Sequence, residues 1–185
     1  MEERQSPTAV SGTEEFGKDV CFVRSGFLFR LRAAAIIIHE GYVLMVKNDC
    51  TPYYYSVGGA VRLGETSQDA VRREVQEECG LDLGILRLAA IHQNFFQDSG
   101  SDGHSWHELA LYYLMDYKGE RLSSARSISM LGNPETLHWI PLDTYSQHNA
   151  YPAFLADLET ILLSPVPMQI VTKEQVPSED AQGQG

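Results

Sequence analysis

The sequence has few of the features that mark secreted, membrane-spanning or nucleic-acid-binding proteins. It carries three cysteines in 185 residues, and this odd, widely spaced set predicts neither a disulfide framework nor a zinc site. No apolar run approaches the roughly 18 residues of a membrane span, and the polar, acidic residues 1–5 do not resemble a secretory signal. We therefore expect a cytoplasmic protein with no membrane partner.

Positive charge is also scarce. Lysine and arginine number 14 against 25 aspartates and glutamates, which gives a formal net charge of −11. Because a protein that binds a nucleic-acid polymer usually presents a basic surface, we expect no such partner. A small nucleotide stays compatible with this charge, since a bound metal ion can reverse the sign locally.

Length and composition predict one globular domain flanked by polar ends. Hydrophobic residues make up 43% of the chain and charged residues 21%, and a chain of 185 residues suffices for one core but is short for two. Residues 1–21 are mostly polar, and residues 164–185 contain three prolines. We therefore predict a flexible N-terminal tail at 1–21, a domain at 22–163 and a flexible C-terminal tail at 164–185.

Strand-like runs dominate the predicted domain, with one helix early and one late. Short apolar or alternating segments bounded by turn residues are typical of strands, and a turn at 39–41 predicts a hairpin. These segments cover residues 27–31, 33–38, 42–47, 53–57, 87–96, 108–117 and 137–140. The spacing of apolar residues predicts an amphipathic helix at 151–163. The fold class is therefore mixed α/β.

The first helix is predicted over Ser67–Cys79, and both of its ends carry signals. Thr66 followed three residues later by Asp69 resembles a capping box, and Gly80 suits the left-handed position after a helix. These signals fix the phase of the helix, and so the direction in which each side chain projects.

This helix concentrates negative charge. Glu74, Glu77 and Glu78 lie within five consecutive residues, and each like-charged pair on one helix face costs roughly 0.2–0.5 kcal/mol. At about 100° per residue, the three carboxylates project beside the apolar stripe of Val71 and Val75. A divalent cation would relieve the repulsion, because it takes oxygen ligands and is usually shared with a phosphate. A solvated acidic helix face is the alternative that the cluster alone leaves open.

The spacing around the cluster is more specific. Gly59 is followed after five residues by Glu65, and after seven more by the segment 73–81, Arg-Glu-Val-Gln-Glu-Glu-Cys-Gly-Leu. This arrangement spans 23 residues and resembles the Nudix box at every fixed position, with predicted strands before and after it. The chain therefore resembles the Nudix hydrolases.

The resemblance implies a fold, a reaction and a cofactor. Nudix hydrolases have an α/β/α sandwich with a mixed β-sheet, and they hydrolyse the diphosphate linkage of small nucleotides with Mg²⁺ or Mn²⁺. The substrate would be a nucleoside triphosphate or a nucleoside diphosphate linked to another moiety, and a homodimer is the assembly that the family suggests. The alternative is a non-catalytic Nudix-fold sensor that binds a nucleotide. The complete set of box glutamates favours catalysis.

The family pattern also implies roles for the residues of the box. Glu74 and Glu78 would be the main metal ligands, with Glu77 as a further ligand or as the residue that positions water. The carbonyl of Gly59 is another candidate ligand, since glycine lets the backbone approach closely.

Arg73 and Glu65 are expected to orient these carboxylates. A general base must reach the attacking water, and Glu77 is the candidate within the box. Some family members use a base on a later strand or loop, so the candidates outside the box are Glu108, Glu120 and Glu135. For each of these three, an ordinary surface or edge position is the alternative.

Candidate substrate-binding residues are Arg62, Tyr55, Phe95 and Glu108. Arg62 stands where an acidic residue is frequent in the family, and it could touch a phosphate. Tyr55 belongs to a run of three tyrosines that alternate across a strand, so it could stack on a base. The alternative for Arg62 is a solvated loop position, and for Tyr55 it is core or edge packing.

Four aromatic residues flank the Gly/Ser/Asp-rich loop at 98–105 and could line one pocket: Phe95, Phe96, Trp106 and His107. Packing within the sheet is the alternative. The proline that ADP-ribose-cleaving members often carry beyond the box is absent, and Gln97 stands at its place. The sequence therefore weakens ADP-ribose as the substrate without identifying another.

Overall fold

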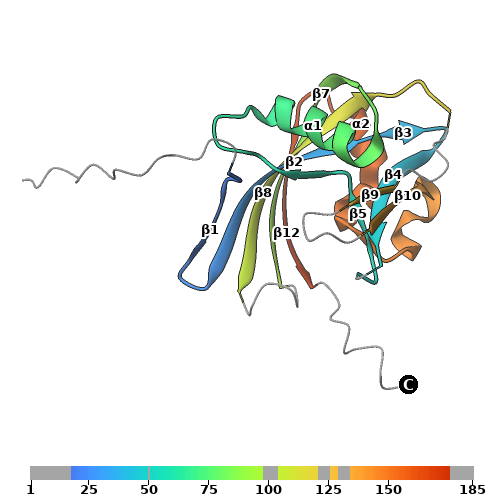
Figure 1. The fold of residues 1–185 in the computed structure, drawn as a ribbon. Coiled ribbons are helices and arrows are strands. Elements are labelled where there is room, and N and C mark those ends of the chain that lie inside the picture. Colours follow the sequence, from blue (N-terminus) through green and yellow to red (C-terminus); the bar gives the residue numbers. More distant parts are fainter. Residues whose placement is uncertain (1–17, 50, 98–103, 121–125, 129–133, 176–185) are drawn as a thin grey trace, which may run out of the picture.

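The computed structural model describes residues 18–49, 51–97, 104–120, 126–128 and 134–175, and its strands form two mixed sheets (Figure 1). The first sheet has the order β1 (Cys21–Arg24), β2 (Phe27–Ile36), β8 (Ser105–Asp116), β7 (Gly84–Gln97), β12 (Met168–Gln175), with β6 (Gly58–Ala60) also paired to β2. The second has the order β11 (Ala150–Tyr151), β5 (Tyr54–Ser56), β4 (Tyr42–Asn48), β10 (Pro134–Pro141), β9 (Arg126–Ile128), with β3 (Ile38–His39) paired to β4.

Helices pack on both sides of these sheets. Helix α1 (Ser67–Cys79) shares a core cluster with Ala33 and Ala35 of β2. The opposite cluster contains Ala34 and Ile36 together with residues of three short helices, η1 (Leu142–Gln147), η2 (Ala153–Asp157) and α2 (Leu158–Leu163). Because successive strand residues point to opposite faces, β2 lies between two helical layers. The predicted α/β/α sandwich with mixed sheets is confirmed.

The hairpin and the first helix form as predicted. Ile38 pairs with Val43 around the turn, and α1 has the predicted bounds. The predicted strand at 53–57 forms as β5, and a further strand that was not predicted, β6, follows it in the other sheet. The chain crosses from the second sheet to the first at Val57, and this crossing places the two glycines that follow beside β2, opposite Ala34 and Ala33.

The predicted helix at 151–163 is only partly correct. The chain first pairs in β11 and turns through η2, and it becomes α-helical only from Leu158. Pro152 stands just before η2, and a proline can begin a helical turn but cannot donate a hydrogen bond within one.

The predicted flexible tails are wrong where they meet the domain. Val20 donates its backbone N–H to the carbonyl of Val61 at 2.8 Å, so residues just before β1 pair with the box segment. Met168–Gln175 form β12, which pairs in parallel with β7, because the edge of β7 would otherwise leave a row of backbone groups unpaired. Residues 1–17 and 176–185 of the predicted tails lie outside the described residues. None of the helices in the described part of the chain has the length and apolar character to cross a bilayer.

Candidate active site

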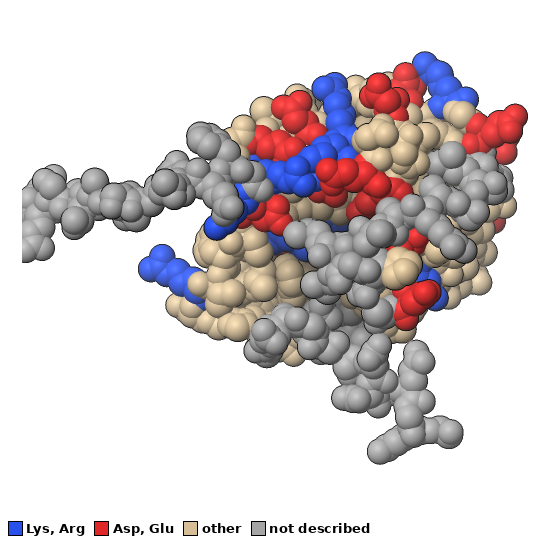
Figure 2. Space-filling model, in the orientation of Figure 1, with Lys and Arg blue, Asp and Glu red and all other residues tan. Residues whose placement is uncertain are grey.

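Helix α1 sets the directions of the acidic side chains, and its ends form as their sequence signals predict. Thr66 accepts the backbone N–H of Asp69 at 3.1 Å, and Gly80 adopts a left-handed conformation with φ of 68°. The buried residues Ala70, Val71, Val75 and Cys79 face the core. Figure 2 shows acidic side chains, with a few basic ones among them, gathered over the face that carries α1.

Glu74 lies directly against the backbone of Gly59. A Cβ atom at Gly59 would lie 2.6–2.7 Å from the carboxyl atoms of Glu74, a separation that non-bonded atoms do not tolerate. Gly59 is held in place because β6 pairs with β2, where it stands opposite Ala33. The absence of a side chain at Gly59 therefore lets a helix carboxylate reach the sheet.

Glu78 reaches the preceding glycine. Gly58 donates its backbone N–H to Oε2 of Glu78 at 3.1 Å. Its φ is 132°, and a Cβ atom there would lie 2.3 Å from the carbonyl oxygen of Ala33, so only glycine fits. Burial, followed by the charge of Glu135, raises the pKa of Glu78 to about 8. A carboxylate in this environment gains from a nearby cation.

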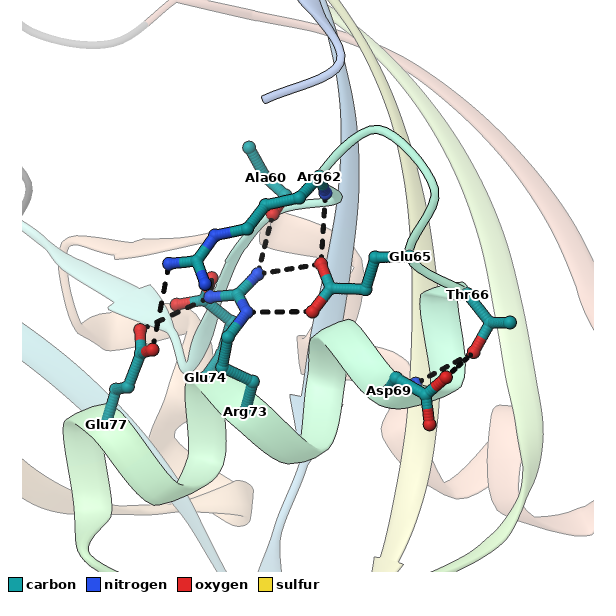
Figure 3. A network of polar contacts seen from close by, with 8 residues as sticks. All are labelled: Ala60, Arg62, Glu65, Thr66, Asp69, Arg73, Glu74 and Glu77. Atoms are coloured by element: carbon teal, nitrogen blue, oxygen red, sulfur yellow. Dashed lines mark hydrogen bonds and ion pairs between the residues drawn. The ribbon is translucent and has the colours of Figure 1, made fainter. Parts of the chain in front are cut away.

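Arg73 ties the box together (Figure 3). Its Nε donates to Glu65 Oε1 at 2.8 Å and its Nη2 to Glu65 Oε2 at 3.0 Å, which is the strong two-point geometry of an arginine–carboxylate pair. Nη2 also donates to the carbonyl of Ala60 at 3.0 Å, and Nη1 donates to Glu74 and to Glu77. The hydrogen bonds from Arg73 lower the pKa of Glu65. Arg73 thus contacts three carboxylates of the box, those of Glu65, Glu74 and Glu77.

Glu77 has a different environment from the other two helix carboxylates. Its side chain is 51% exposed, whereas that of Glu74 is 13% exposed. It lies 3.2 Å from Arg73 and 3.7 Å from Nη2 of Arg62. Arg62 therefore lies beside the helix carboxylates, and its charge is directed at Glu77.

The three acidic residues outside the box have three different environments. Glu108 is 3% exposed; Arg30 donates to it from Nε at 2.7 Å, and Arg32 lies 4.0 Å away. Although burial raises its pKa, the two arginines hold the pKa of Glu108 below its usual value. Glu120 is exposed at the end of a described segment. Glu135 is 4% exposed and its charge acts on Glu78.

Tyr55 contacts Glu135 and not a free pocket. Its hydroxyl donates to Glu135 Oε1 at 2.6 Å and accepts from Asn48 Nδ2 at 3.2 Å. Burial and the hydrogen bond to Glu135 raise the pKa of Tyr55. The candidate residue for base stacking therefore holds Glu135, the acid whose charge raises the pKa of Glu78.

The four aromatic residues near 98–105 do not share one surface. Phe95 stacks on His107 with ring centroids 4.4 Å apart, and Phe96 stacks on Trp106 at 5.4 Å. Each pair consists of directly opposite residues in the β7–β8 register, and the two pairs are adjacent along the strands. Adjacent positions point to opposite faces, so the hypothesis of a common pocket is wrong. Phe96 and Trp106 lie on the face of Glu108, and Phe95 lies on the other.

Arg30 and Arg32 were not predicted from the sequence as residues of the site. Both lie in β2 two residues apart, so they share one face with Glu108, with which they pair. Nη2 of Arg32 donates to the carbonyls of Ser56 and Gly58 at 2.7 and 2.9 Å. The alternation of two arginines with Leu31 in a strand was the available signal, but it is equally typical of a solvated edge.

The donor set fits a hard divalent cation whose remaining ligands would be water and phosphate oxygens. Among the described residues, no group of three or more His, Cys, Asp or Glu side chains is arranged so that it could hold a metal ion. Mg²⁺ seldom uses such a group, since it takes one or two carboxylates together with water and phosphate oxygens. Glu74 and Glu78 supply two carboxylates beside the glycine backbone, and the space at Gly59 that a Cβ would fill is occupied by the Glu74 carboxylate.

The fold and this helix define the class of protein. It is an α/β/α sandwich in which an acidic helix packs against Gly58 and Gly59, where the chain passes from one sheet to the other. A family model described as the NUDIX domain matches residues 28–158. Because the match covers most of the chain, the protein belongs to the NUDIX domain family. The expected membership is confirmed.

Solved structures agree with this fold. The MutT protein from Bacillus halodurans is 18% identical, with a TM-score of 0.57 over 79% of this chain and 90% of that one. The MutT protein from Methanosarcina mazei Go1 is 18% identical, with a TM-score of 0.53 over 72% of this chain and 92% of that one. At these identities the likeness shows the fold alone. A comparison with curated proteins finds no match.

Proposed function

We propose that the protein is a Mg²⁺-dependent pyrophosphohydrolase that cleaves the diphosphate linkage of a small nucleotide. The observation that carries this proposal is the contact of two helix carboxylates, Glu74 and Glu78, with the backbone of Gly59 and Gly58. A purely structural acidic helix would not need its carboxylates packed against two glycines. The substrate is a nucleoside triphosphate or a nucleoside diphosphate linked to another moiety.

Glu74 and Glu78 would hold the Mg²⁺ or Mn²⁺ ion, with the carbonyl of Gly59 and the exposed Glu77 as further candidates. When bound, the ion would neutralise charge on the diphosphate and activate water. Arg73 and Glu65 keep the carboxylates in place through their paired hydrogen bonds.

Two residues compete as the general base. Glu77 is exposed at the box, but Arg62 and Arg73 both attract its carboxylate. Glu135 is buried, acts electrostatically on Glu78 and is oriented by the Tyr55 hydroxyl. Among the acids outside the box, Glu135 is favoured over Glu108, since the Glu108 carboxylate is already paired with arginine.

Recognition of the rest of the substrate falls to residues around this cluster. Arg62 lies at the box, where a phosphate would draw it away from Glu77. Phe96 and Trp106 replace Phe95 as candidates for stacking on a base, because they lie on the face of Glu108. A cytoplasmic location and a homodimer stay predictions.

The test is to incubate the purified protein with Mg²⁺ and a panel of nucleotides and to identify the products by mass spectrometry. Glu78→Gln is the inactive variant, and Glu159→Gln, on the exposed face of α2, is the matched control that should keep wild-type activity. Nucleoside monophosphate with pyrophosphate would indicate a triphosphate substrate. Nucleoside monophosphate with a phosphorylated second moiety would indicate a linked nucleoside diphosphate.

One outcome would reject the hydrolase. If the wild-type protein binds a nucleotide of the panel but leaves every compound intact, the non-catalytic sensor becomes the better description. Equal activity of wild type and Glu78→Gln would instead assign any observed hydrolysis to a contaminant or to another site.

A further inference from the structure

Arg32 is a charged residue in the interior of the first sheet. It is 8% exposed and comes from the middle of β2, opposite Ala60 of β6 and Ala110 of β8. A charge in such a position is costly unless it is paired and hydrogen-bonded. Its guanidinium lies 4.0 Å from Glu108 and donates to two backbone carbonyls. The two carbonyls are those of Ser56 and Gly58, on either side of Val57.

Both carbonyls belong to the segment Ser56–Gly58, called the crossing below, where the chain passes from one sheet to the other just before Gly59 of the box. Nη2 of Arg32 is 2.7 Å from the oxygen of Ser56 and 2.9 Å from the oxygen of Gly58. The N–H of the same Gly58 donates to Glu78. Both backbone groups of Gly58 are therefore bound. Its carbonyl accepts from Arg32, and its N–H donates to Glu78, a proposed metal ligand.

The crossing needs this support because its backbone is unusual. Gly58 has φ of 132°, a region that other residues rarely adopt, and a short strand lies on each side of Val57. Arg32 fastens the carbonyls on both sides of this point with a single nitrogen. Its positive charge also attracts Glu74 and Glu78 from the sheet side.

Glu108 is the counter-charge that holds Arg32. Oε2 of Glu108 accepts from Arg30, which leaves Oε1 directed at Arg32. Arg30 lies on the same strand face and shares Glu108, but its side chain stacks over Trp106 at 4.6 Å and has no hydrogen bond to the crossing among the described contacts. The two arginines therefore share Glu108, but of the two only Arg32 is hydrogen-bonded to the Ser56–Gly58 backbone in the described part of the chain.

We propose that Arg32, anchored by Glu108, is a positioning residue that fixes the Ser56–Gly58 backbone and thereby the metal-binding carboxylates of α1. This proposal rests on the proposed function, because it assigns Glu74 and Glu78 to the cation. It adds a residue outside the box that acts through the backbone and touches neither the cation nor the nucleotide.

The test compares Arg32→Met with the matched control Arg30→Met in the full-length protein without substrate. Mn²⁺ affinity is measured by electron paramagnetic resonance titration, and the exchange rate of the Gly58 amide proton is measured by NMR without metal. Removal of an outer partner of a metal site lowers affinity by about 10–100-fold. We expect Arg32→Met to weaken Mn²⁺ binding about tenfold and to accelerate Gly58 exchange about tenfold, whereas Arg30→Met changes either by less than about twofold.

Arg32→Lys separates geometry from charge. A lysine keeps the positive charge but loses the fixed planar fork of donors, so we expect it to recover only part of the affinity. Full recovery would show that charge alone suffices and would overturn the positioning role. If Arg32→Met does not fold, Arg32→Gln takes its place in the comparison.

Other results also decide the matter. Equal losses in Arg30→Met and Arg32→Met, or a less stable Arg32→Met with wild-type Mn²⁺ affinity and Gly58 exchange, would overturn the proposal. If the wild type binds Mn²⁺ but cleaves no nucleotide, the hydrolase function fails while the positioning role stands. If the wild type binds no Mn²⁺, the assignment of the cation fails, and Gly58 exchange alone decides whether Arg32 orders the crossing.

Discussion

Glu78 and Glu108 are two glutamates removed from most of the solvent, yet their surroundings have opposite effects. Arg30 and Arg32 flank Glu108 and hold its pKa below the usual value in spite of burial. Burial and the neighbouring Glu135 raise the pKa of Glu78 to about 8. Glu108 already has its cations within the chain, whereas Glu78 lies where an external cation would be most stabilising. The carboxylate of Glu108 is therefore neutralised by arginines of the chain, whereas that of Glu78 would be stabilised by a bound cation.

The largest expected effect is on catalysis. Glu78→Gln removes the charge that would hold the cation, so we expect kcat/KM for the nucleotide found in the panel to fall at least about 1000-fold, beyond the loss caused by an outer partner. Initial rates with Mg²⁺ in excess measure this, with Glu159→Gln as the control. A loss of less than tenfold would remove Glu78 from the cation site.

The second prediction concerns stability and reverses the roles of the two residues. Glu108→Gln leaves Arg32 buried without a counter-charge, and breaking a buried pair costs about 3 kcal/mol or somewhat more. We expect the free energy of unfolding, measured with urea, to fall by about this amount. Glu78→Gln should not destabilise the metal-free protein, because burial and the charge of Glu135 disfavour the ionised form of Glu78 and glutamine removes that charge. Equal destabilisation by both variants would show that the two sites do not differ in this way.

The third prediction uses His92, a buried neighbour of Glu108. Burial lowers the pKa of His92 to about 4, whereas an unfolded histidine titrates near 6.5. Between these values the unfolded chain binds the proton and the folded chain does not, so stability is full above about pH 6.5 and falls as the pH drops towards 4.

This loss should reach about 3 kcal/mol between pH 7 and pH 4. Urea unfolding of wild type and His92→Gln across that range measures it, since the variant should lack this part of the pH dependence. Parallel curves for the two proteins would contradict the prediction.

The smallest expected effect is at the glycine under Glu74. A methyl group in Gly59→Ala would meet the Glu74 carboxylate at 2.6 Å and push it aside, so we expect Mn²⁺ affinity to fall about tenfold while the fold is kept. Gly84→Ala is the matched control, because its Cβ would make only an ordinary contact at 3.8 Å with Asp116. Unchanged affinity in Gly59→Ala, or an equal loss in both variants, would contradict the prediction.

Local signals made the box helix predictable. Capping residues and a terminal glycine set the bounds of α1, and the i, i+4 spacing of Arg73 and Glu77 brings them together on any helix. Arg73 and Glu65 were expected to act on the same carboxylates, and they also pair with each other. These contacts span few residues, so the sequence carries enough information to place them.

Contacts across the sheets could not be predicted in the same way. Arg32 and Gly58 lie 26 residues apart, and Tyr55 and Glu135 lie 80 apart. Each contact depends on which strands pair and in what register, and a shift by one residue would move every side chain to the other face. For the same reason the four aromatic residues near the loop at 98–105 were considered as one group, although they form two.

The pairing of β12 with β7 shows that the unit that folds is larger than the pattern that identifies the family. The family match ends at residue 158, ten residues before β12 begins. Yet β12 supplies Thr172, whose hydroxyl lies 2.6 Å from Nε2 of the buried His92 and donates to Asn94 at 2.7 Å. A protein shortened to the matched region would keep every box residue and would open a sheet edge beside a buried imidazole. The boundaries of a recognisable motif and of a self-sufficient fold are thus set by different residues.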